Sequence, residues 1–144
     1  MLEREPPVTR VFAHRGVTGA AVENTLGAFL AAVASGADGV ELDVRRTLDG
    51  ALVVHHDAEV AGLGPIPSLR VRDLPGHVAL LDEALEVLEP LAVNVEIKND
   101  PDEPGHDPSG SLSHDVVAAL EARGATDRFV VSSFDLGTLD AVRG

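Results

Sequence analysis

Short runs of alternating apolar and polar residues recur along the chain, and segments with helical spacing separate them. The first run, 11–13, is apolar and leads into His14, as expected of a buried strand that delivers polar groups at its end. A helix is expected over 26–35, because Thr25 is a suitable N-cap and Gly36 a suitable stop. The apolar stripe expected for this helix consists of Leu26, Phe29, Leu30 and Val33.

The segment 39–44 alternates strictly. Its apolar face is formed by Val40, Leu42 and Val44. Glu41 and Asp43 share the opposite face, and side chains spaced in this way lie about 7 Å apart along a strand. Residues 92–98 repeat the pattern, with Asn94, Glu96 and Lys98 as the polar set. Both segments are therefore predicted to be strands with one polar face.

Residues 52–57 follow the 39–44 segment too closely for a helix to intervene, since a parallel crossover usually takes a dozen or more residues. A two-residue hairpin turn at Asp49-Gly50 is the favoured connection, and it pairs Asp43 with His56. A tight parallel return without a helix is the alternative.

The rest of the chain follows the same plan. We expect loops over 57–75 and 99–113, helices over 81–88, 115–123 and 136–142, and a further strand over 129–133. Strands that alternate with helices at this spacing indicate an α/β architecture, and a parallel (β/α)₈-type barrel is the natural candidate. Only about five strands are predicted, so the barrel is expected to be incomplete, with residues 1–144 forming the N-terminal part of one barrel domain.

Charged residues collect at the ends of the predicted strands. They are His14 and Arg15, Glu41 and Asp43, His56 and Asp57, and Glu96 and Lys98. In a barrel these ends meet at one mouth, where catalytic groups sit. Converging carboxylates repel one another unless a hard cation binds them, so Glu41, Asp43 and Glu96 are predicted metal ligands. Oxygen ligands favour Mg²⁺ or Ca²⁺, and Mn²⁺ fits as well.

Two histidines at the same mouth, His14 and His56, form a candidate pair for acid–base catalysis near neutral pH. Arg15 and Lys98, the only lysine, offer positive charge to phosphoryl oxygens. Two acidic residues are candidate supports. Glu23 would cap or brace the loop after the first strand, and Asp57 would either orient a histidine or close a turn.

Plainer interpretations compete with these roles. The acidic face of 39–44 is also typical of a solvated edge hairpin, in which Arg45 neutralises Glu41 and Asp43. His55 alternates to the other face and is expected to pack or hydrogen-bond there. The remaining histidines, His77, His106 and His114, are expected to be exposed and without a role.

Composition narrows the function. The net charge of −13 disfavours nucleic-acid binding, and a phosphate-ester substrate would need a local cation beside so acidic a chain. The chain has no Cys, which rules out disulfides and thiolate metal sites. Met1 to Arg10 lack an apolar signal region, and no apolar run approaches the roughly 18 residues of a membrane span. We expect a cytoplasmic protein without stable membrane insertion.

Five segments resemble, in order and spacing, the motifs of the glycerophosphodiester phosphodiesterase family. They are HRG (14–16), ENT (23–25), GADGVELDVRRTLDGALVVHHD (36–57), VEIK (95–98) and SSF (132–134). The resemblance implies a barrel enzyme that uses a divalent cation to hydrolyse glycerophosphodiesters to an alcohol and sn-glycerol 3-phosphate. It also implies acid–base roles for the two histidines, metal binding by the three carboxylates and phosphate binding by Arg15 and Lys98.

Two departures from the family pattern matter. Val22 stands where the family usually has proline, and the chain is shorter than the roughly 250 residues of a whole barrel. Two alternatives therefore stay open: a lysophospholipase D-like enzyme with the same site, and a non-catalytic fragment that only binds or regulates. Exposed strands at both ends of an open sheet also predict self-association.

Overall fold

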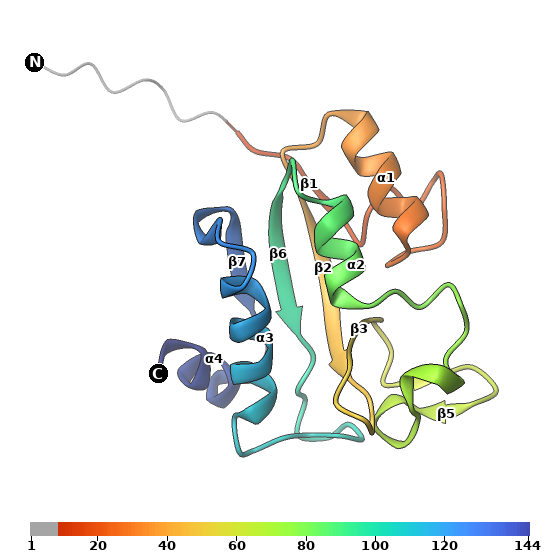
Figure 1. The fold of residues 1–144 in the computed structure, drawn as a ribbon, viewed down its shortest axis with the longest axis vertical. Coiled ribbons are helices and arrows are strands. Elements are labelled where there is room, and N and C mark those ends of the chain that lie inside the picture. Colours follow the sequence, from red (N-terminus) through yellow and green to blue (C-terminus); the bar gives the residue numbers. More distant parts are fainter. Residues whose placement is uncertain (1–8) are drawn as a thin grey trace, which may run out of the picture.

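The computed structural model describes residues 9–144. Residues 1–8, most of the N-terminal segment in which the sequence shows no apolar signal region, lie outside the described part. The strands are β1 (Phe12–His14), β2 (Gly39–Arg46), β3 (Leu52–Val54), β4 (Glu59–Val60), β5 (Gly64–Pro65), β6 (Ala92–Ile97) and β7 (Phe129–Ser132). The helices are α1 (Leu26–Ser35), α2 (Leu81–Val87), α3 (Ser111–Glu121) and α4 (Leu136–Arg143), with short 3₁₀ turns at Ile66–Ser68, Val71–Asp73 and Thr126–Arg128. Figure 1 shows the arrangement.

Four strands form a parallel sheet in the order β1-β2-β6-β7, and a helix follows each of β1, β6 and β7 directly. This sequential order is that of consecutive units in a (β/α)₈ barrel. Within residues 9–144 the sheet does not close, because β1 and β7 remain its two edges. The predicted fold class, an incomplete α/β barrel, is confirmed.

Strand β3 turns back and pairs with the end of β2 in the antiparallel sense, as predicted. The predicted register is wrong by one residue: Val44 lies opposite Val54, and the backbone oxygen of Asp43 accepts a hydrogen bond from the amide of His55 rather than meeting His56. The Thr47 hydroxyl accepts from the Ala51 amide at 3.0 Å and closes a wider loop than a two-residue turn. Since β3 is antiparallel, only four of the strands counted in the sequence are barrel strands.

Helix α1 begins and ends where the sequence predicts. The Thr25 hydroxyl accepts from the amide of Ala28, and Gly36 adopts a left-handed φ of 75° that ends the helix. The predicted stripe is partly wrong, because Leu30 is 57% exposed and the fully buried residues are Ala28, Phe29 and Ala32. At 3.6 residues per turn, Leu30 points away from the side of the helix on which these three residues lie.

Two other segments differ from prediction. Helix α3 begins at Ser111, one turn earlier than expected, because the Asp107 carboxylate accepts hydrogen bonds from the Leu112 amide and the Ser111 hydroxyl. The predicted loop 57–75 holds the β4–β5 ribbon and two 3₁₀ turns that pack around the fully buried Ile66.

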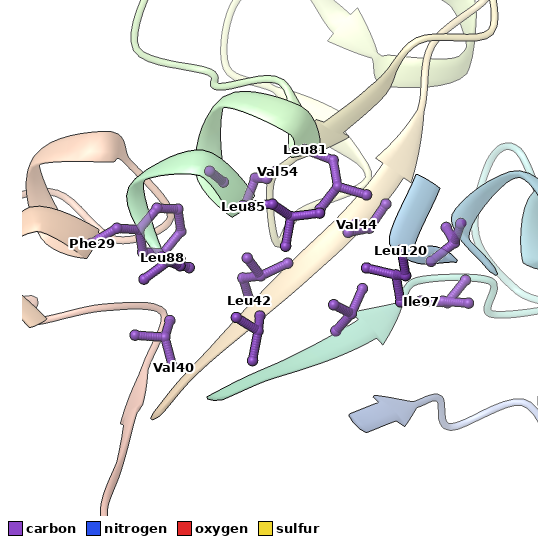
Figure 2. Packing of buried hydrophobic residues seen from close by; sticks show 14 of the residues in the cluster. Phe29, Val40, Leu42, Val44, Val54, Leu81, Leu85, Leu88, Ile97 and Leu120 are labelled. Carbon is purple, nitrogen blue, oxygen red and sulfur yellow. The ribbon is translucent and has the colours of Figure 1, made fainter. Parts of the chain in front are cut away.

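The main core lies between the sheet and helices α1, α2 and α3 (Figure 2). The sheet contributes Val40, Leu42, Val44, Val93, Val95 and Ile97, all with almost no exposure. Because side chains alternate along a strand, the polar residues of β2 and β6 lie on the other face of the sheet. No helix in residues 9–144 has the length and apolar character of a membrane span.

Candidate metal and phosphodiester site

Three carboxylates meet on the polar face of the sheet. Asp43 on β2 lies directly beside Glu96 on β6, and Glu41 precedes Asp43 by two residues on the same face. One oxygen from each of the three lies within 4.8 Å of the others. The Asp43 side chain is only 1% exposed, and those of Glu41 and Glu96 are 12% and 15% exposed. The structure thus brings the three predicted ligands together.

Glu41 is the carboxylate with the least support from neighbouring groups. Both of its side-chain oxygens are buried, and neither has a hydrogen-bond partner within residues 9–144. Burial, and secondly the charges of Asp43 and Glu96, raise the pKa of Glu41 to about 7. A buried carboxylate without partners is costly, and a cation bound by oxygen ligands would remove that cost. The residues present therefore fit a divalent cation.

Two positive side chains flank Asp43. Arg15 Nε lies 3.2 Å from one carboxylate oxygen, and Lys98 Nζ lies 3.1 Å from the other. Lys98 also donates to Glu96 Oε1 at 2.6 Å. Burial works to lower the pKa of Lys98, but its bonds to Glu96 and Asp43 outweigh burial and raise it. Two positive groups thus face three carboxylates, which leaves one negative charge when Glu41 is ionised.

The two predicted catalytic histidines lie at this end of the sheet. His14 Nε2 is 3.6 Å from Glu41 Oε2, and its side chain is 70% exposed. His56 lines a pocket of about 170 Å³ together with Glu23 and Asn24. Its Nδ1 is 2.7 Å from Asp57 Oδ1, and this hydrogen bond lowers the pKa of Asp57. Both imidazoles are accessible from outside the core.

The two predicted supports, Glu23 and Asp57, each bond a side chain at this end of the sheet. Arg15 NH1 donates to Glu23 Oε1 at 3.0 Å, so Glu23 holds the guanidinium that reaches Asp43. Asp57 bonds His56 directly. His55 uses Nδ1 to contact the backbone oxygen of Asp57 at 2.9 Å, in keeping with the hydrogen-bonding role expected for it.

Arg45 does not neutralise the carboxylates, which corrects the alternative raised by the sequence. Its side chain is 6% exposed and pairs with Glu103 at 2.8 Å. Its Nε and NH2 both donate to the backbone oxygen of His56, at 2.9 and 2.6 Å. The other histidines lie apart from the carboxylates: His77 and His114 are exposed as expected, whereas His106 is partly buried.

The sequence did not predict the contact of Asn24, which donates to Asp43 Oδ2 at 2.8 Å. The available signal was its place in the segment ENT, one residue before the N-cap of α1. Nothing in the local pattern pointed to Asp43, which lies 19 residues further along the chain.

The fold and this site define a class: part of a (β/α)₈ barrel with its ionisable groups at the carboxyl ends of parallel strands. The family model described as "Glycerophosphoryl diester phosphodiesterase family" matches residues 14–144. The chain belongs to this family of phosphoric diester hydrolases.

Relatives agree with this assignment. A glycerophosphodiester phosphodiesterase of Bacillus altitudinis is 35% identical over 155 aligned positions, which cover 92% of this chain and 60% of that protein. An Oleispira antarctica phosphodiesterase, solved in complex with the product sn-glycerol-3-phosphate, superposes with a TM-score of 0.76 at 27% identity and covers 94% of this chain and 61% of its own. The lysophospholipase D GDPD1 of Rattus norvegicus is 38% identical over 79 positions, 52% of this chain and 25% of that protein. The chain thus spans about 60% of the length of the first two relatives.

Proposed function

We propose that this chain supplies the metal-binding and acid–base groups for the hydrolysis of glycerophosphodiesters to an alcohol and sn-glycerol 3-phosphate. The observation that carries the proposal is the buried set of Glu41, Asp43 and Glu96, with both Glu41 oxygens lacking hydrogen-bond partners in the described part of the chain. Family membership and the product bound to the Oleispira antarctica phosphodiesterase support the choice of substrate.

The three carboxylates would hold a divalent cation, with Mg²⁺, Ca²⁺ and Mn²⁺ all suited to oxygen ligands. When bound, the cation would offset the negative charge of the phosphodiester and polarise its phosphoryl oxygens. The remaining negative charge of the five-group cluster supports binding of a cation rather than of a bare anion at this position.

His14 and His56 would exchange protons with the substrate and water. The bond between His56 Nδ1 and Asp57 fixes the imidazole, which leaves Nε2 to take or give a proton. His14 Nε2 lies 3.6 Å from Glu41 Oε2, and its 70%-exposed side chain leaves it open to the substrate. One imidazole would accept a proton while the other donates one.

Arg15 and Lys98 would bind the phosphate. Lys98 has three donors: one bonds Glu96 Oε1, and Nζ lies 3.1 Å from Asp43 Oδ1, so a donor remains for a phosphoryl oxygen. Arg15 presents a planar guanidinium, which suits phosphoryl oxygens, and Glu23 holds it in place.

Two alternatives remain from the sequence. The GDPD1 relative favours a lysophospholipase D-like substrate, which has the same glycerophosphodiester unit with an acyl chain. The chain covers only about 60% of the length of its relatives, which favours a chain that binds metal but does not turn over substrate by itself. Cytoplasmic location and association through the open β1 and β7 edges are further parts of the proposal.

The test is release of glycerol 3-phosphate from glycerophosphocholine with Mg²⁺, Ca²⁺ or Mn²⁺, against an EDTA-treated sample. His56→Ala should lower kcat by about 10²–10⁴-fold, the usual loss on removing a general acid or base. His114→Ala on the exposed face of α3 is the matched control and should leave kcat unchanged. Equal activity of the two variants would overturn the role of His56.

Lysophosphatidylcholine as the only accepted substrate would favour the lysophospholipase D alternative. Metal binding without turnover of either substrate would favour the non-catalytic one.

A further inference from the structure

Asn24 is a buried neutral residue beside the carboxylate cluster. It is 4% exposed, although it lies in the loop between β1 and α1 rather than on a strand. Its φ of 55° is left-handed, a conformation that asparagine tolerates better than most side chains. A buried polar side chain in this conformation calls for specific partners.

Both polar ends of the Asn24 side chain contact one residue. Nδ2 donates to Asp43 Oδ2 at 2.8 Å, and Oδ1 accepts from the Asp43 backbone amide at 3.4 Å. Arg15 Nε lies 3.2 Å from the same Asp43 Oδ2. Asp43 Oδ1 has no hydrogen bond of good geometry among residues 9–144, although Lys98 Nζ lies 3.1 Å away. The two oxygens of Asp43 are thus in different surroundings.

The loop that carries Asn24 is tied to β2 and α1. The Arg15 amide donates to the Glu41 backbone oxygen at 2.9 Å, and the Asn24 amide donates to the Arg15 backbone oxygen at 3.0 Å. Gly16 permits this path, because a Cβ there would lie 2.7 Å from Ala28. The position of Asn24 is therefore set by backbone bonds that do not involve its side chain.

We propose that Asn24 is a positioning residue that fixes the orientation of the Asp43 carboxylate. Its hydrogen bond holds Oδ2 against the loop between β1 and α1, so that Oδ1 faces the divalent cation. The inference rests on the metal role of Asp43 under the proposed function. An amide suits this task because it donates a hydrogen bond without adding positive charge.

The test measures Mn²⁺ affinity of the whole 144-residue chain from the free-Mn²⁺ signal in electron paramagnetic resonance. Asn24→Gly keeps the left-handed backbone and removes the amide, and Asn24→Ser keeps a neutral polar side chain that is too short to make the bond to Asp43 Oδ2. Each should weaken Mn²⁺ binding by about 10–100-fold, the typical loss on removing an outer partner of a metal ligand. Circular dichroism confirms folding, and if Asn24→Gly does not fold, Asn24→Ser carries the test.

Asn99→Ala is the matched control. Asn99 is another buried asparagine, 5% exposed, whose side chain bonds Thr138 and the backbone of Asp107. Its loss should lower the melting temperature without changing Mn²⁺ affinity, which separates general destabilisation from positioning.

The outcomes distinguish the two proposals. No Mn²⁺ binding by the unmodified chain would overturn the metal site of the proposed function itself. Binding by the unmodified chain, with both folded Asn24 variants within about twofold of it, would overturn the positioning role alone. A loss of affinity in Asn99→Ala equal to that in Asn24→Gly would also overturn it.

Discussion

The two faces of the sheet are made by alternate residues of the same strands, yet they differ in almost every physical respect. The face under the helices is apolar and closely packed, with Leu42 and Val95 fully buried. The opposite face holds Asp43, Glu96 and Lys98, whose side chains are nearly as inaccessible but are charged. Burial alone therefore does not distinguish a residue of the hydrophobic core from one of the candidate site. The charges and hydrogen-bond partners around each buried side chain make that distinction.

The helix-covered face should carry most of the stability. Leu42→Ala leaves a cavity between β2 and the helices and should lower the free energy of unfolding by about 3 kcal/mol in a urea titration. Leu30→Ala, on the 57%-exposed side of α1, should change it by less than about 0.5 kcal/mol. Equal losses would mean that the face under the helices is not the main core.

The polar face should cost stability when no cation is present. The raised pKa of Glu41, about 7 against an ordinary 4.5, means that the folded chain holds this proton more tightly than the unfolded chain. The contribution of Glu41 to the free energy of unfolding is thus fully present below pH 4.5 and is lost as the pH rises through about 7.

Glu41→Gln should accordingly stabilise the EDTA-treated chain by about 2 kcal/mol at pH 8 and have little effect at pH 5. Mn²⁺ should raise the melting temperature of the unmodified chain at pH 8 and leave that of Glu41→Gln unchanged. The exposed Glu59→Gln is the control and should behave as the unmodified chain. A fall in stability of Glu41→Gln at pH 8 would contradict the account of a carboxylate without partners.

Asp107 sharpens the contrast, since it is a carboxylate with many donors. Partial burial works to raise its pKa, but hydrogen bonds from Ser109, Leu112 and Ser111 hold it well below the usual range. A carboxyl group with a lowered pKa stabilises the folded chain at neutral pH. This stabilisation begins to be lost below the ordinary pKa of 3.8, and the loss is complete once the pH falls below the lower pKa of the folded state.

Asp107→Asn should therefore cost about 1–2 kcal/mol at pH 7, and the difference should shrink in acid. Asp115→Asn removes a half-exposed partner of Arg46 and should cost less than about 0.5 kcal/mol at either pH. A constant difference for Asp107→Asn down to pH 2 would contradict the assigned hydrogen bonds.

The smallest expected effect concerns the open edge. Val130 on β7 is 56% exposed, and β7 is an edge of the sheet within residues 9–144. Val130→Lys should weaken self-association several-fold in sedimentation velocity, because charge on an edge strand opposes pairing. Leu63→Lys, at an exposed position between β4 and β5, is the control. An unmodified chain that sediments as a monomer at all concentrations would remove the hypothesis of self-association.

Local patterns predicted the parts of the fold that local physics decides. Strict alternation placed Glu41 and Asp43 opposite the core, and the cap chemistry of Thr25 and Gly36 fixed both ends of α1. The hairpin register was not predictable from the turn residues, because the Thr47 side chain closes a wider loop.

Long side chains and distant loops escaped the sequence for a different reason. Alternation put Arg45 on the face of the carboxylates, but its length lets it reach the backbone of His56 instead. Asn24 reaches Asp43 through a left-handed loop residue whose partner is set by tertiary structure alone.

The single lysine has a practical consequence for chemistry on this protein. Lys98 lies between Glu96 and Asp43, its side chain is 14% exposed, and its raised pKa keeps the ammonium protonated at neutral pH. An amine-selective acylating reagent should therefore label this side chain slowly, and peptide mapping separates this label from one on the N-terminal amine because the chain has no other lysine. The labelling rate therefore reports on the cluster. Any change that breaks the contacts of Lys98 with Glu96 and Asp43 should alter the rate at which the label appears.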